Sequence, residues 1–369
     1  MQSSALRAAV VVVAVAYMIC AANAGTLIPI PPVPGSTTTD IRAINDDNVI
    51  TGDYTTPDGI EHGFVGTLDG DYTTFDFPNG NTSPTGINND GYITGLANNS
   101  TDDCPVYGCE YLRSPDGKIK AITKDGAVLD GVAQGIISHT RFVGQYTFFD
   151  QNDQLFYYGY YGKGTKYRTG LTLPFNTTRT QPRGYNKKGT VTGFFLDLNH
   201  SSLRTGFVLK DDVATAVNYP DNNATYTLLE SVNDKGMIAG AWQNNGDTAG
   251  QAFLFDFAKN EFLPISVPGA TVSFAGGINN VGVVAVSGDF SVSYIYCLKK
   301  KSCPLSPRAI ETLDRWIPAR TRAAICRHSC MEPMRTPARD RKIDVSAIRG
   351  AAGRDPEFRR TGGDPRSIR

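Results

Sequence analysis

The stretch AINDDNVITG at residues 43–52 decides the fold, because copies of it return along the whole chain. Residues 86–95 have the sequence GINNDGYITG, and weaker copies end at Gly144, Gly193, Gly240 and Val286. Successive copies are therefore spaced 43 to 49 residues apart. A period in this range is typical of one supersecondary unit that is repeated side by side. The sequence thus specifies an architecture more directly than an activity.

Each unit contains four short segments that are suited to β-strands. In the first unit these are residues 40–44, 49–54, 62–67 and 73–77. Apolar and polar residues alternate within such segments, and Asn, Asp, Gly and Pro separate them, which is typical of strands joined by tight turns. Because no helical stripe occurs between residues 25 and 298, we expect an all-β fold.

The sixth unit lacks a fourth segment after residue 297, and a matching segment stands at the start of the chain instead. LIPIPPVPG at residues 27–35 resembles LPISVPG at residues 263–269. A first strand that completes the last unit would remove an exposed sheet edge. We therefore predict a six-bladed β-propeller of four-stranded blades over residues 25–298, closed by an N-terminal strand. An open β-solenoid is the alternative.

The repeated phrase, with HGF at residues 62–64 and QAF at residues 251–253, resembles the HAF-type extracellular repeat family. The resemblance covers about residues 26–298, and the third unit departs from it at residues 137–141, ISHTR. The resemblance implies export and a propeller fold. It assigns no catalytic residue.

Residues 1–24 have the pattern of a signal peptide, with Arg7 before an apolar run and Ala22 and Ala24 before the expected cleavage site. We do not expect a lipid on Cys20, because Ile19 stands where a lipoprotein signal requires Gly or Ala. No second apolar stretch is long enough for a transmembrane helix. We therefore expect a secreted or extracellular protein.

The charge is divided between a folded domain and a tail. Residues 25–298 hold 17 Lys and Arg against 28 Asp and Glu, whereas residues 299–369 hold 18 against 8. The acidic domain excludes nucleic acid as an expected partner, because phosphate binding needs a basic face. The basic tail has no apolar period and is predicted to be mostly disordered. RDPEF at residues 354–358 resembles a translated cloning linker, so this part of the tail is either native sequence or linker added by read-through.

Cysteines occur in close pairs. In an oxidising compartment we expect disulfides within each of two pairs, Cys104 with Cys109 and Cys297 with Cys303. The spacing alone also suits a metal, although no His lies nearby in the sequence. Cys326 and Cys330 flank Arg-His-Ser in the tail, where loose thiols are the simpler expectation.

Six Asn-x-Ser/Thr triplets fall between the predicted strands. They are expected to carry surface sugars if the host glycosylates secreted proteins. The acceptors are Asn81, Asn98, Asn99, Asn176, Asn199 and Asn223.

A residue that returns in every unit is architectural, so a functional site is expected where the pattern is broken. The Asn of the phrase, as in Asn45 and Asn88, is expected to bond backbone near a turn. The third unit holds a block of aromatic residues, and a single Trp lies between residues 25 and 298. Such residues either stack on a ligand such as a sugar or pack in the core. The candidate ligand-binding residues are Trp242, Tyr157, Tyr158 and Tyr160.

The sequence contains no complete motif for a phosphate loop, a zinc protease, a serine hydrolase or an EF-hand. We expect neither a cofactor nor a metal, and the pattern favours a non-enzymatic scaffold that binds an extracellular glycan or protein. The alternative is a secreted hydrolase or lyase that acts on polysaccharide at the mouth of the propeller. The sequence names no ligand and no oligomeric state.

Overall fold

All regular elements of the described residues are β-strands, which confirms the predicted all-β class. The predicted signal peptide, and the predicted disordered tail apart from Lys299 and Cys303, lie outside the described residues. Within the described part, no helix is long and apolar enough to cross a membrane. The computed structural model describes residues 25–78, 80–98, 108–128, 130–149, 151–152, 154–200, 203–244, 249–299 and 303.

The strands form six antiparallel groups of four, which we call blades 1 to 6. Blade 3 also contains two short strands, β10 (Thr123–Lys124) and β11 (Ala127–Val128), and one parallel bridge, Arg204 with Tyr226, joins blades 4 and 5. Blade 1 contains β2 (Thr38–Ile44), β3 (Ile50–Thr55), β4 (Glu61–Gly66) and β5 (Tyr72–Phe75), and blade 2 contains β6 (Asn81–Ile87), β7 (Ile93–Asn98), β8 (Cys109–Arg113) and β9 (Ile119–Ala121). Blade 3 contains β12 (Gly131–Ser138), β13 (Arg141–Phe149), β14 (Leu155–Lys163) and β15 (Lys166–Leu171), and blade 4 contains β16 (Thr180–Tyr185), β17 (Val191–Asp197), β18 (Leu203–Lys210) and β19 (Val213–Val217). Blade 5 contains β20 (Tyr226–Val232), β21 (Met237–Gln243), β22 (Gly250–Asp256) and β23 (Glu261–Ile265), and blade 6 contains β24 (Ser273–Ile278), β25 (Val283–Gly288), β26 (Val292–Cys297) and β1 (Thr26–Pro29).

The turn of the repeated phrase sets the boundary between the first two strands of each blade. Gly91, Gly189 and Gly236 have φ of 79°, 84° and 83°, in the left-handed region that Gly adopts without strain. Asn48 fills the same place in blade 1 with φ of 61°. Asn tolerates this conformation better than most residues, so the turn survives the substitution.

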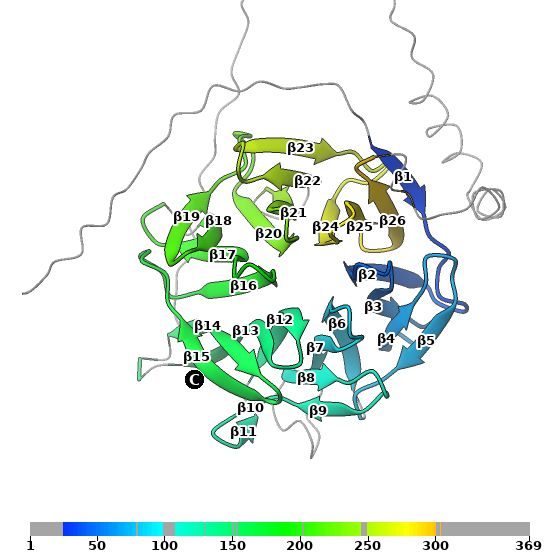
Figure 1. Cartoon of the computed structure of the whole chain (residues 1–369), viewed down its shortest axis with the longest axis horizontal. Helices are drawn as coiled ribbons and strands as arrows, with labels where there is room; N and C mark the ends of the chain where they lie inside the picture. The colour runs from blue at the N-terminus through cyan, green and yellow to red at the C-terminus, as the bar shows by residue number, and fades with distance from the viewer. Residues whose placement is uncertain are drawn as a thin grey trace, which may run out of the picture. The chain divides into compact units, whose positions relative to one another are not determined.

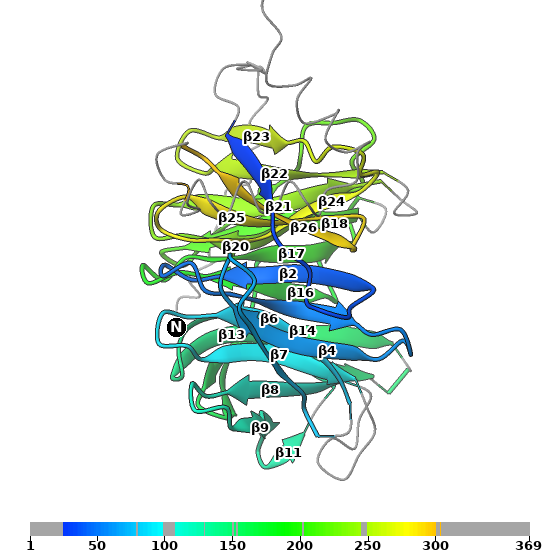
Figure 2. The ribbon, with the colours of Figure 1, turned by 90° about the vertical axis from the view of Figure 1, so that its right-hand side faces the viewer.

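The first strand of each blade lies innermost, around a common axis, and the fourth lies outermost (Figures 1 and 2). Buried apolar side chains form six clusters, one at each seam between consecutive blades. The cluster between blades 6 and 1 joins Ile50 and Phe64 to Val283 and Ile295. Each such side chain stabilises its seam by about 1.5–3 kcal/mol when fully buried. Because the last blade packs on the first, the solenoid alternative is wrong.

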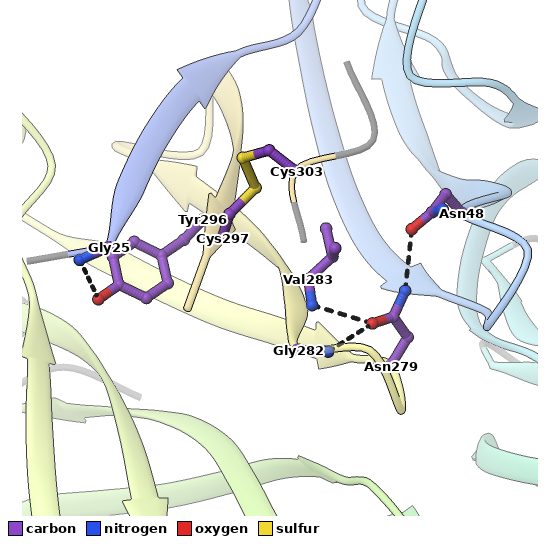
Figure 3. The surroundings of a disulfide bond; sticks show 8 residues. All are labelled: Gly25, Asn48, Asn279, Gly282, Val283, Tyr296, Cys297 and Cys303. Carbon is purple, nitrogen blue, oxygen red and sulfur yellow. Dashed lines mark hydrogen bonds between the residues drawn. A yellow bond between two sulfur atoms is a disulfide. The ribbon is translucent and has the colours of Figure 1, made fainter. Parts of the chain in front are cut away.

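The N-terminal strand closes blade 6, as the sequence predicts. β1 pairs with β26 antiparallel, with Thr26 opposite Cys297 and Pro29 opposite Tyr294. Next to this pairing Cys297 forms a disulfide with Cys303, and the Gly25 amide donates a hydrogen bond of 3.0 Å to the Tyr296 hydroxyl (Figure 3).

The other predicted disulfide stays a prediction. Cys104 lies outside the described residues, and Cys109 is fully buried in the seam between blades 1 and 2.

Each inner pair of strands contains a β-bulge at the same point of the repeat. The Gly that ends the phrase allows it, since a Cβ on Gly52 would lie 2.0 Å from the Asp40 carbonyl oxygen. A bulge redirects one side chain of its strand. The residues in the bulges are Arg42, Thr85, Gln134, Arg183, Glu230 and Gly276.

Candidate functional site

The Asn of the repeated phrase links neighbouring blades at one end of the axis, which we call the asparagine end. Asn45 Oδ1 accepts hydrogen bonds from its own turn, from the amides of Asp47 (3.0 Å) and Val49 (2.9 Å). Its Nδ2 donates to the carbonyl of the next blade. The five such links are Asn45 to Asn88 (3.2 Å), Asn88 to Ile137 (3.1 Å), Asn186 to Asn233 (2.9 Å), Asn233 to Asn279 (3.1 Å) and Asn279 to Asn45 (3.0 Å).

This belt of amides is interrupted between blades 3 and 4. Ile137 occupies the Asn position there, and its side chain has no amide group that could donate a hydrogen bond. At the same seam, Arg141 donates a hydrogen bond of 3.3 Å to the Tyr185 hydroxyl, and its guanidinium lies 5.4 Å from the centre of that ring. A different interaction therefore fastens the one seam that lacks the amide.

A second, incomplete set of links between blades lies one residue further along the phrase. Asn280 Nδ2 donates to carboxylates on both neighbouring blades, Asp46 (3.0 Å) and Asp234 (2.9 Å). Asn89 Nδ2 also donates to Asp46, at 2.8 Å. Burial acts to raise the pKa of Asp46, but the hydrogen bonds from Asn89 and Asn280 lower it below its ordinary value. These carboxylates are therefore engaged in holding blades together.

A cavity of about 110 Å³ lies on the axis at the asparagine end, lined by the inner strands of all six blades. The bulge residues Arg183 and Glu230 line it, with 3.8 Å between Arg183 Nε and Glu230 Oε2. This volume holds a few waters or a small molecule. Unlike the belt, the bulge position differs in identity from blade to blade, so it is a candidate for chemistry.

The bulge of blade 1 has a separate charged cluster. Arg42 lies 3.1 Å from Asp40 and 2.9 Å from Asp53. Burial raises the pKa of Asp40 to about 6, although the nearby Arg42 charge acts in the opposite direction. Among the described residues, no group of three or more His, Cys, Asp or Glu is placed to hold a metal ion.

Blade 3 presents a stack of aromatic rings, which we call the aromatic ladder. It contains Phe156, Phe148, Tyr158, Tyr146 and Tyr167, with successive ring centres 5.3, 4.8, 5.8 and 5.3 Å apart. Tyr158 and Phe148 are 43% and 37% exposed, whereas the inner end of the ladder is half-buried. Four of its rings stand on β13 and β14, which are nine residues long and extend away from the asparagine end, and Tyr167 stands on β15.

The four predicted ligand-binding residues do not form one site. Tyr158 is exposed in the ladder, but Tyr160 is 1% exposed and donates a hydrogen bond to the buried Glu110. Tyr157 is half-buried and lies 5.0 Å from the Arg179 guanidinium.

Trp242 lies in another part of the ring. It is half-buried in the cluster between blades 4 and 5, and its ring centre is 5.7 Å from that of Tyr219. Tyr160 packs in the core of the structure. Ligand binding by the four residues stays a prediction.

Two groups of residues were missed by the sequence analysis. Phe148 and Phe156 belong to the aromatic block, and alternation along two long strands would have placed them on one face with Tyr158. The bulge residues carry no such signal, because a bulge is visible only in the pairing of two strands.

No family model matches the sequence, and no curated protein is similar to it. Among solved structures, the chain is similar to virginiamycin B lyase from Staphylococcus aureus (12% identity, TM-score 0.44, 74% of this chain and 99% of the lyase). It is also similar to the Aleuria aurantia lectin (10%, 0.45, 71% and 93%) and to TolB from Acinetobacter baumannii (12%, 0.44, 72% and 65%). Identities and TM-scores this low say nothing about the activity of this chain.

Proposed function

We propose that the protein is a secreted recognition scaffold and that its aromatic ladder binds an extracellular glycan. The ladder carries the proposal, because two of its rings, Phe148 and Tyr158, are open to solvent in a continuous stack. Sugar rings place their C–H faces on such aromatic surfaces. The resemblance of the repeated phrase to HAF-type extracellular repeats supports a role outside the cell.

The axis supports a glycan site less well than the ladder does. Its Asn and Asp side chains are occupied by links between blades, as at Asn280 and Asp46. Its cavity of about 110 Å³ encloses no more than a small molecule, so a long saccharide would be held only at the mouth. The ladder, in contrast, has no such limit on the length of its ligand.

A glycan array probed with the full chain and with Tyr158→Ala tests the proposal. We expect the variant to bind about tenfold more weakly, which corresponds to a loss of about 1.4 kcal/mol. Val213→Ala, at a 65% exposed position of blade 4, is the control and should bind normally. If Tyr158→Ala binds every glycan as the unaltered protein does, the ladder is not the binding surface. If the ligand is a protein instead of a glycan, the chain binds none of the glycans on the array but still binds its protein partner.

A polysaccharide hydrolase or lyase with its site at the mouth of the propeller is the second candidate, and the pair formed by Arg183 and Glu230 on the axis favours it. Glycoside hydrolysis usually needs two carboxyl groups across a cleft, whereas this pair supplies one carboxylate and one cation. A turnover assay on the glycans found by the array decides the matter. Turnover that Glu230→Gln abolishes, in a variant that still folds, would replace the scaffold proposal by an enzyme.

A further inference from the structure

The five predicted glycosylation acceptors that the structure describes fall at one end of the propeller, and Asn99 lies outside the described residues. This end, opposite the asparagine end, contains the connections between blades and the turns between second and third strands, and we call it the connector end. Asn98 ends β7 opposite Asn81, the first residue of β6. Asn199 follows β17, while Asn176 and Asn223 lie in the connections before β16 and β20.

The asparagine end contains many Asn residues but no acceptor. None of its Asn residues is followed two positions later by Ser or Thr. Asn content alone therefore does not explain why the acceptors lie at the connector end. These residues are Asn45, Asn48, Asn88, Asn89, Asn186, Asn233, Asn260, Asn279 and Asn280.

The side chains at the connector end differ in access. Asn98, Asn176, Asn199 and Asn223 are exposed, so a sugar on any of them would extend into solvent. Asn81 is half-buried, its Oδ1 accepts a hydrogen bond from the Glu61 amide (3.2 Å), and Thr82 beside it is fully buried. A sugar on Asn81 would disturb this packing.

No acceptor lies between residues 100 and 175, which include all of blade 3. The exposed rings of the aromatic ladder, Phe148 and Tyr158, lie at the connector end of that blade. The acceptors therefore surround the ladder on neighbouring blades and leave the ladder itself without one.

We propose that N-linked glycans on Asn98, Asn176, Asn199 and Asn223 cover the connector end and leave the aromatic ladder as an open window. The inference rests on the secretion assumed in the proposed function. The acceptor is the side-chain amide of Asn, and the donor is an oligosaccharide linked to a polyprenyl diphosphate, supplied with a transferase by the secretory host.

The transfer forms one bond and breaks one. The Asn Nδ2 bonds to the anomeric carbon of the sugar, and the bond from that carbon to the diphosphate oxygen breaks. The polyprenyl diphosphate leaves with the electron pair, and the amide proton passes to a base of the transferase.

Site occupancy is measured on the full chain secreted from a eukaryotic host. Peptide N-glycosidase in ¹⁸O water converts each glycosylated Asn to labelled Asp, which mass spectrometry locates. We expect label at the four exposed acceptors and little at Asn81. Asn222, next to Asn223 in the same loop but outside any triplet, is the control and should stay unlabelled. Secreted protein without label at the four acceptors overturns the proposal.

The open window is tested without any glycan ligand, by hydroxyl-radical footprinting of Tyr158. Enzymatic removal of the sugars should leave the labelling of Tyr158 unchanged and increase it around Asn176 and Asn223. Gln154→Thr creates a new acceptor at Asn152, in the turn between β13 and β14. Once glycosylated, this variant should lose half or more of its Tyr158 labelling. Tyr158 labelling that rises on deglycosylation of the unaltered chain would show a covered ladder and refute the window.

These measurements also separate the inference from the proposed function. Occupied acceptors with an open window, together with a glycan array that shows no binding, would keep the proposed glycan cover of the connector end and remove only the glycan ligand. If the acceptors carry no sugar but Tyr158→Ala loses binding on the array, the proposed function stands and the glycan cover is refuted.

Discussion

A single Asn side chain performs two tasks in this ring, and Asn279 shows both. Its Oδ1 accepts hydrogen bonds from the amides of its own turn, including Val283 at 2.9 Å. Across the seam that closes the ring, its Nδ2 donates to the Asn45 carbonyl at 3.0 Å. It also donates to Asn48 Oδ1 at 3.0 Å (Figure 3). The repeated position predicts the turn, because local spacing shows it. The link to the next blade is a tertiary contact, which no local pattern contains.

Replacement of Asn279 by Ala should lower the free energy of unfolding by about 2–3 kcal/mol, because buried backbone groups of the turn lose their partner. Urea denaturation measures this change. Asn222→Ala, at an exposed loop position, is the matched control and should unfold like the unaltered protein. Equal midpoints for the two variants would show that the belt contributes nothing to stability.

Glu110 is a fully buried carboxyl group between blades 2 and 3, and it accepts a hydrogen bond from the Tyr160 hydroxyl. Burial raises its pKa well above the ordinary value, so the folded protein retains the proton that the unfolded chain releases. Stability therefore falls as the pH rises above the unfolded pKa of about 4.5. This side chain lies where the sequence alternation of β8 alone gives no hint of a buried charge.

Glu110→Gln removes this titration while keeping a hydrogen-bonding group of similar shape. We expect the melting temperature of the variant to exceed that of the unaltered protein by a margin that grows from pH 5 to pH 8, since one unit of pKa shift corresponds to about 1.4 kcal/mol. Glu261→Gln, at an exposed position of β23, serves as control. Parallel melting curves for Glu110→Gln and the unaltered protein across this range would contradict the assignment.

At the scale of elements, the strands are predictable because turns and alternation are local. The segments expected at residues 40–44 and 49–54 are β2 and β3, within two residues at each end. The sites are harder to predict. Tyr158 and Tyr160 lie two residues apart on the same face of β14, and the extent to which blade 2 covers that face decides which of them is buried, so the sequence could not separate buried Tyr160 from exposed Tyr158. The bulges depend on the register between two strands, and they position Arg183 and Glu230 on the axis.

The interrupted belt gives a prediction for the seam between blades 3 and 4. Ile137→Asn should supply the missing donor to the Asn186 carbonyl and raise the free energy of unfolding by about 1 kcal/mol, the usual net value of one hydrogen bond. Thermal unfolding of the variant is compared with that of Val213→Asn, a 65% exposed position outside the belt. A destabilised Ile137→Asn would mean that the Arg141 contact with Tyr185 replaces the amide link and excludes it.

At the scale of the whole molecule, a ring of blades depends on its last seam. β1 supplies the outer strand of blade 6, and its Ile28 is 7% exposed in the cluster that joins blade 6 to blade 1. Without β1, the edge of β26 would present unpaired backbone groups to other molecules. The segment that precedes the first repeat thus completes the architecture, which the match between residues 27–35 and 263–269 made predictable.

Ile28→Ala tests this closure against a chemically identical change elsewhere. Ile265, which is 1% exposed on the outer strand of blade 5, provides Ile265→Ala as the matched control. Each variant should lose about 2–5 kcal/mol, the usual cost of truncating a buried Ile to Ala. Only Ile28→Ala should also scatter light in mild urea, because only β1 can detach and expose β26 while the rest of the ring stays folded. Equal scattering by the two variants would mean that the ring unfolds as a unit and that β1 has no separate role in holding it shut.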